Sequence, residues 1–131
     1  AVIVDTMGEL ASIYGMGDVA IVGGGFKNTG GHNPMEPAAA GLPIIMGKNM
    51  HNFEDTSEKF VSAGGALQVD SDPDALAEAI KGLLENEGKS RYMGEKNRHI
   101  IEQFRGSAAA TAVIINEILL ENRKRGMNGH D

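Results

Sequence analysis

The chain has 131 residues, 41% of them hydrophobic, which predicts one globular domain with a single core rather than a disordered segment. Its 18 acidic and 12 basic side chains give a net charge of −6, which argues against broad nucleic-acid binding. The absence of cysteine excludes disulfides and thiolate metal sites, and the four histidines have no metal-ligand spacing. No apolar run approaches the roughly 20 residues of a membrane-spanning helix, so we expect a soluble domain.

The chain opens on the apolar segment Ala1–Val4, which predicts a buried strand at the very start and therefore a piece of a longer protein. Further strands are predicted at 18–22, 43–46 and 66–69, each short, apolar and bounded by Gly, Pro or Asp. Helical patterns lie between these strands. The alternation predicts an α/β fold: a Rossmann-like parallel sheet with right-handed crossovers.

Two predicted helices begin at capping signals. Thr6-Met7-Gly8-Glu9 has the spacing of a capping box and predicts a helix from Thr6, with an apolar face made by Leu10, Ile13 and Tyr14. Asn33 followed by Pro34 predicts a second, short helix, which Gly41-Leu42-Pro43 ends.

Four more helices are predicted downstream. Residues 52–63 follow a helical period, with one face made by Phe53, Thr56, Ser57, Phe60 and Val61. Asp72-Pro73 opens the next helix as N-cap and first-turn proline, with a buried stripe of Leu76, Ala79, Ile80, Leu83 and Leu84. Two helices, at about 89–104 and 107–124, close the chain, and the apolar side of the last is Ile114, Ile115, Ile118 and Leu119.

The segment with the clearest functional pattern is Gly30-Gly31-His32-Asn33-Pro34-Met35-Glu36, which follows a strand and the glycine run Gly23–Gly25. A strand, a glycine-rich loop and a helix start are how α/β proteins build phosphate and nucleotide sites. The helix start at Thr6–Glu9 also follows a strand, so both starts are expected at the carboxyl edge of the sheet. Exposed N–H groups there favour an anion, and a carboxylate can hold sugar hydroxyls.

Each of these features also has a purely structural interpretation. The two helix starts can be caps alone, and the glycines can form a tight strand-to-helix turn. His32 can donate to a phosphate or bond to the backbone. His51, Asn52 and Glu54 can line the same edge, although capping by Asn52 is the simpler explanation.

The order and spacing of these motifs resemble the C-terminal part of the 3-deoxy-D-manno-octulosonic acid (Kdo) transferases. The resemblance rests on four segments in the first half of the chain: Asp5-Thr6-Met7-Gly8-Glu9-Leu10, Asp18-Val19-Ala20-Ile21-Val22-Gly23-Gly24, Gly30–Ala39, and Pro43-Ile44-Ile45-Met46-Gly47 with Asn52-Phe53. The helical remainder matches in pattern more than in letters.

The resemblance implies the C-terminal half of a GT-B glycosyltransferase, with CMP-Kdo as donor, a lipid A precursor as acceptor and no metal or other cofactor. It implies a location at the cytoplasmic face of the inner membrane for the full-length protein. The residues it implies for the nucleotide are Met7, Gly8, Glu9, Asn33, Pro34, Met35 and Glu36, with Thr6, Gly24, Gly31 and His32 as possible additional donor contacts. Glu36 suits the ribose hydroxyls.

The sequence departs from the family at Gly25, where Ser is common, and at Thr29, where Arg is common. The acceptor domain, the catalytic base and the first strands of the donor domain are expected upstream, so the chain alone is expected to bind CMP without catalysis. Membrane contact is likewise expected through the missing part. The alternatives are a non-catalytic Rossmann-like binding module and a GT-B transferase that uses a UDP-sugar.

Overall fold

A computed structural model describes Ile3 and residues 9–127 of the chain. The chain divides into two compact units, Ala1–Ile101 and Glu102–Asp131. The first unit holds the sheet and its helices, and the described part of the second unit is helical. The predicted strand at the start lies outside the described residues, except for Ile3, whose side chain is exposed.

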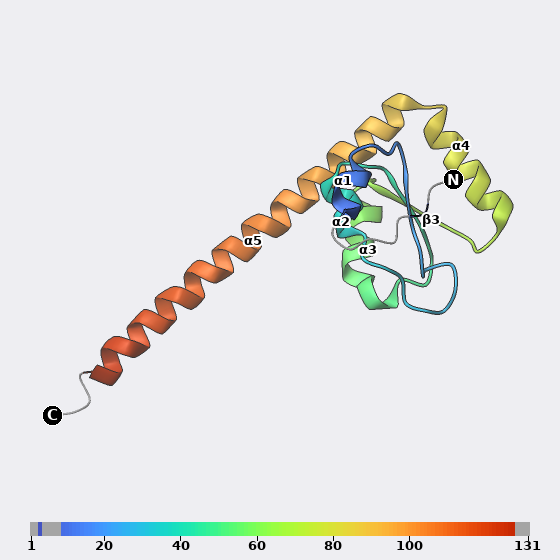
Figure 1. The fold of residues 1–131 in the computed structure, drawn as a ribbon. Coiled ribbons are helices and arrows are strands. Elements are labelled where there is room, and N and C mark those ends of the chain that lie inside the picture. Colours follow the sequence, from blue (N-terminus) through green and yellow to red (C-terminus); the bar gives the residue numbers. More distant parts are fainter. Residues whose placement is uncertain (1–2, 4–8, 128–131) are drawn as a thin grey trace. The chain divides into compact units, whose positions relative to one another are not determined.

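Three parallel strands form the sheet in the order β1-β2-β3. Figure 1 labels β3 of this sheet together with the α-helices. They are β1 (Ala20–Val22), β2 (Ile44–Gly47) and β3 (Ala66–Val69), each within two residues of its predicted bounds. The register aligns Ala20 with Ile44, and Ile44 with Ala66. Short apolar runs bounded by glycine and proline thus identified the strands, and the Rossmann-like parallel sheet is confirmed.

Helices α2 (Met35–Ala39) and α3 (Glu54–Ser62) make the two crossovers, and the 3-10 helix η1 (His51–Phe53) leads into α3. Because both crossovers move the same way along the sheet, right-handed connection places them on the same face. Ala38 of α2 and Phe60 of α3 are fully buried. The predicted helical period over 52–63 is therefore confirmed.

The opposite face of the sheet is covered by α4 (Pro73–Leu84) and by the first turns of α5 (Glu87–Met127). Their buried side chains Leu83 and Met93 form one core cluster with Ile45 of β2. Helices on both faces shield the central strand completely, which explains why β2 is an unbroken apolar run.

The start of α4 agrees with its sequence signals. The Asp72 carboxylate accepts a hydrogen bond from the Ala75 N–H at 3.0 Å, and Pro73 occupies the first turn. Of the predicted stripe, Leu83 is buried, whereas Leu84 is 59% exposed, so its assignment to the core is wrong. Leu84 is the last residue of α4, and its side chain faces solvent.

Helix α1 (Leu10–Tyr14) begins later than predicted. Glu9 is its N-cap residue and makes no side-chain capping bond to the first turn of α1. Thr6 lies outside the described residues, so the capping box between Thr6 and Glu9 stays a prediction. Leu10 is exposed, contrary to expectation, while Ile13 and Tyr14 are half-buried.

The two predicted C-terminal helices are in fact one, because α5 runs without a break through Gly106. A glycine inside a helix costs only about 1 kcal/mol, and alanines, the best helix formers, follow at 108–110. The side chains that form the apolar side of the last predicted helix, Ile114, Ile115, Ile118 and Leu119, are exposed. Helical period alone cannot distinguish a face that packs within the chain from one that does not.

Buried Asn97 of α5 joins this helix to the beginnings of two strands. Its Nδ2 donates to the Leu42 carbonyl at 2.7 Å and to the Gly65 carbonyl at 2.8 Å. These carbonyls lie just before β2 and β3. Asn97 therefore fixes the first turns of α5 against the amino edge of the sheet and leaves the carboxyl edge free for a site.

Candidate functional site

Two loops meet at the carboxyl edge of the sheet, the edge where open α/β sheets bind ligands. One follows β1 and spans residues 23–34, and the other follows β2 and spans residues 48–50. The Asn49 N–H donates to the Gly25 carbonyl at 3.0 Å, and the Asn52 N–H donates to the Gly30 carbonyl at 2.9 Å. The two loops therefore form one hydrogen-bonded platform.

Side-chain amides strengthen the same contact between the loops. The Asn49 Nδ2 donates to the Gly25 carbonyl, and the Asn52 Nδ2 donates to the Thr29 carbonyl, both at 3.3 Å. Asn52 therefore does not cap α3, as the sequence had suggested, because Phe53 holds that position without a side-chain capping bond. Asn52 instead ties η1 to the glycine-rich loop.

The paired glycines of the first loop are required by its backbone and its packing. Gly30 and Gly31 have φ values of +89° and +80°, which side-chain-bearing residues rarely adopt. A Cβ on Gly31 would overlap the Met50 sulfur, and one on Gly30 would overlap the Asn52 carboxamide. The tight-turn interpretation is therefore correct for this pair, and both glycines are buried.

The predicted contact residues follow directly after this turn. The His32 N–H donates to the Gly23 carbonyl at 3.0 Å, and a Cβ on Gly24 would lie 3.1 Å from both Gly31 and the His32 ring. The structure thus brings Gly24, Gly31 and His32 together. His32 itself is exposed, so its imidazole is accessible to a ligand.

The next four residues turn the chain into α2. The Asn33 Oδ1 accepts a hydrogen bond from the Met35 N–H at 3.0 Å. Pro34 rather than Asn33 is the N-cap residue of α2, and it makes no side-chain capping bond, so the predicted cap at Asn33 is wrong by one residue. Pro34 is fully buried, so it presents no surface to a ligand in this structure. Met35 is half-buried, whereas Asn33 and Glu36 are exposed. Asn33 and Glu36 are therefore the accessible polar side chains of this segment.

The carboxylate of Glu36 lies near the end of α1, because α1 packs against α2. Burial, together with the nearby Glu36 carboxylate, raises the pKa of the Tyr14 phenol above its ordinary value of 10.0. Tyr14 therefore stays neutral at physiological pH and presents an uncharged neighbour to Glu36.

Of the other predicted helix start, Thr6-Met7-Gly8-Glu9, the structure describes only Glu9. Thr6, Met7 and Gly8 lie outside the described residues, and Glu9 is exposed at the N-cap of α1. The structure joins the two helices through the packing of α1 on α2. A shared ligand between the two starts stays a prediction.

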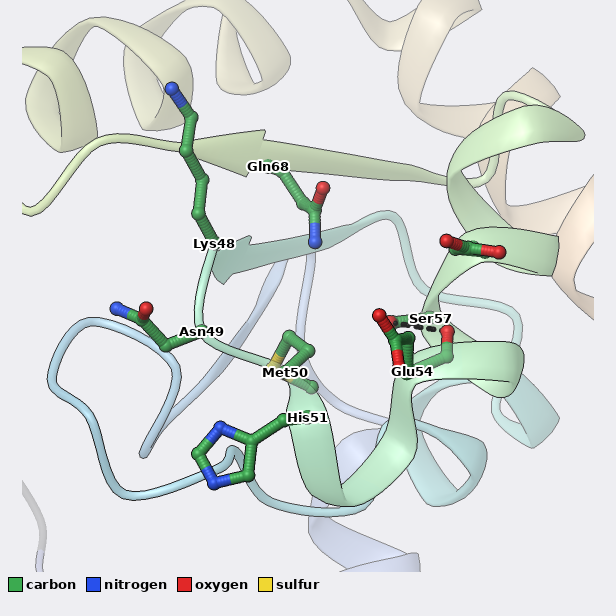
Figure 2. A pocket seen from close by; sticks show the side chains of 8 residues that line it. Lys48, Asn49, Met50, His51, Glu54, Ser57 and Gln68 are labelled. Atoms are coloured by element: carbon green, nitrogen blue, oxygen red, sulfur yellow. Dashed lines mark hydrogen bonds between the residues drawn. The ribbon is translucent and has the colours of Figure 1, made fainter.

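A polar hollow of about 270 Å³ opens beside the second loop (Figure 2). Its walls come from the end of β2, from η1 and α3, and from β3. Sequence reasoning considered His51 and Glu54 but missed Glu58 and Gln68, which line it too. The available signal was Gln68, a polar residue inside the otherwise apolar strand β3.

The described residues contain neither a cluster of metal-ligating side chains nor a membrane-spanning helix. Within residue 3 and residues 9–127, no three acidic or histidine side chains gather closely enough to hold a metal ion. Over the same residues, no helix has the length and apolarity that crossing a bilayer requires.

Residues 4–100 match the family model described as "Glycosyl transferases group 1". Two curated relatives are 3-deoxy-D-manno-octulosonic acid transferases. The one from Haemophilus influenzae is 36% identical over 90% of this chain and 28% of its own length. The one from Bordetella pertussis is 40% identical over 72% of this chain and 22% of its own length. The chain thus spans about a quarter of these relatives.

A solved structure resembles the fold as well. It is the crystal structure of the C-terminal CMP-Kdo binding domain of WaaA from Acinetobacter baumannii, with a TM-score of 0.68 and 26% identity. The match covers 76% of this chain and 51% of that chain.

Proposed function

Because the chain belongs to the glycosyl transferases group 1 family, we propose that it is part of an enzyme that transfers Kdo from CMP-Kdo to a lipid A precursor, and that it binds the donor. The observation that carries the proposal is its likeness to the CMP-Kdo binding domain of WaaA, at a TM-score of 0.68. The exposed Asn33 and Glu36 at the carboxyl edge of the sheet support it.

The nucleotide would be held by groups with distinct tasks. The Glu36 carboxylate can accept hydrogen bonds from both ribose hydroxyls, which no neutral side chain does as well. His32 and Asn33 offer donors for the phosphate. The dipole of α2 adds little, because the helix has only five residues. In this proposal Met7, Gly8 and Glu9 complete the nucleotide contacts from the other helix start.

Glycosyl transfer needs a base to deprotonate the acceptor hydroxyl and donors to stabilise the departing phosphate. This chain would supply the second part, through the residues around Asn33. The base, the acceptor site and the membrane contact at the cytoplasmic face would come from other parts of the protein. The proposal involves no metal ion and no nucleic acid.

Isothermal titration of the chain with CMP tests this proposal. We expect measurable binding that EDTA leaves unchanged, and no transfer activity from the chain alone. Glu36→Ala should weaken CMP binding by about 1–3 kcal/mol, because it removes a charged hydrogen-bonding group. Glu78→Ala, on the exposed side of α4, is the matched control and should leave the affinity unchanged.

Two results would contradict the proposal. One is the absence of both heat and a melting shift with CMP. The other is a Glu36→Ala protein that melts much earlier yet binds CMP as before, which would make Glu36 purely structural. Competition between CMP and UDP separates this donor from a UDP-sugar, because UDP should fail to displace CMP.

A further inference from the structure

The polar hollow beside β2 has the chemistry of a site for hydroxyl groups (Figure 2). Glu54 and Glu58 are one helical turn apart on α3, so their carboxylates lie on one side of the hollow. Gln68 reaches in from β3 on the other side. Carboxylates accept hydrogen bonds, and a carboxamide both donates and accepts them, a mixture suited to neighbouring hydroxyls.

The charge of the hollow disfavours a phosphate. Its one lysine, Lys48, is bound to Asp70, with 2.6 Å between Nζ and Oδ1, so its charge is already matched. Glu54 and Glu58 then make the hollow acidic at neutral pH. A phosphate or a carboxylate would be repelled, whereas an uncharged polyol would not.

Buried residues form the bottom of the hollow. Met50 and Ser57 are buried beneath it, and the Ser57 hydroxyl donates to the Glu54 carbonyl at 2.9 Å. At about 270 Å³ it is smaller than the roughly 300–1,000 Å³ of pockets that enclose whole ligands, so it suits one part of a larger ligand.

The hollow borders the hydrogen-bonded platform that the two loops form. Asn49 lines the hollow and also donates to the Gly25 carbonyl, and Met50 lies against Gly31. The hollow therefore adjoins the glycine-rich loop that leads into Asn33 and Glu36.

We propose that this hollow binds the polyhydroxylated part of the donor sugar, with the acidic group of the sugar directed away from Glu54 and Glu58. The inference rests on the proposed function, because it takes the nucleotide to lie at Asn33 and Glu36. The hollow thereby makes the domain prefer the intact nucleotide sugar over the bare nucleotide.

Separate titrations with CMP and with CMP-Kdo test the inference. The wild-type chain should bind CMP-Kdo at least about tenfold more tightly than CMP. Glu58→Ala and Gln68→Ala should each reduce this ratio by about fivefold while CMP affinity stays the same. Glu78→Ala on α4 is again the control and should leave the ratio as it is.

Amide NMR spectra of the wild-type chain provide a test that needs no variant. CMP should shift the amides around Asn33–Glu36, and CMP-Kdo should add shifts at Asn49–Glu54 and at Gln68. Equal affinities for the two ligands, an unchanged ratio in both variants, or added shifts elsewhere would overturn the inference while leaving CMP binding intact. Failure of CMP itself to bind would instead overturn the proposed function, and the inference with it.

Discussion

Asn97→Ala removes a side chain that joins α5 to the starts of two strands. The wild-type carboxamide is fully buried, and its Nδ2 donates to the carbonyls of Leu42 and Gly65. Its Oδ1 has no hydrogen-bond partner in the structure. The substitution therefore removes two good hydrogen bonds and one unsatisfied oxygen.

The loss of stability in Asn97→Ala depends on which hydrogen-bond donors remain for the carbonyls of Leu42 and Gly65. Among the described residues the Leu42 carbonyl accepts from Asn97 alone, so its loss carries the full penalty of a buried acceptor, about 1–3 kcal/mol. The Gly65 carbonyl keeps the Ile44 N–H at 3.3 Å, so its loss is nearer 1 kcal/mol. Removal of the unsatisfied Oδ1 returns about 1 kcal/mol. We expect a net loss of about 1–3 kcal/mol.

Urea unfolding followed by circular dichroism measures this loss as a lower midpoint at an unchanged slope. Asn97→Asp should be worse than Asn97→Ala, because it directs a buried carboxylate oxygen at two carbonyls. Glu95→Ala, at an exposed position of the same helix, should change little. A loss below about 0.5 kcal/mol for Asn97→Ala, or an Asp variant as stable as the Ala variant, would refute the reasoning.

Three further predictions concern other parts of the fold. Because folding raises the pKa of Tyr14, the neutral phenol contributes fully to stability below pH 10.0, and this contribution is lost as the pH rises through the folded-state pKa. Glu36→Gln should lower the folded-state pKa of Tyr14, which titration of phenolate absorbance measures. Gly31→Ala should destabilise by at least about 2 kcal/mol in urea unfolding, whereas Gly82→Ala, in open space on α4, should stabilise by up to about 1 kcal/mol. Asp72→Ala should cost about 1 kcal/mol in the same assay, through loss of its cap.

The sheet was predictable because its determinants are local. Each strand is a short apolar run with a glycine, proline or aspartate at its ends, and the Asp72-Pro73 pair marks the start of α4 within one turn. Such signals depend on neighbours in sequence, so no knowledge of tertiary contacts is needed.

Features that depend on distant contacts could not be predicted. Asn97 finds its acceptors 55 and 32 residues away, and nothing near it in sequence marks it as buried. An apolar helix face is buried only where another element packs on it. Ile114 and Leu119 follow the helical period of apolar residues and yet are exposed in the described structure. The helix boundary proposed near residue 106 failed because one glycine costs less than the surrounding helix formers contribute.

The glycine-rich loop shows how one sequence pattern can carry two roles. Gly30 and Gly31 let the loop pack on Met50 and Asn52, and this packing places His32 and Asn33 at the edge of the sheet in exposed positions. A ligand site at this edge would need the same fixed loop, since mobile donors would lose binding energy to ordering. The tight turn and the proposed binding site would therefore both follow from the same glycines, and the two interpretations do not compete.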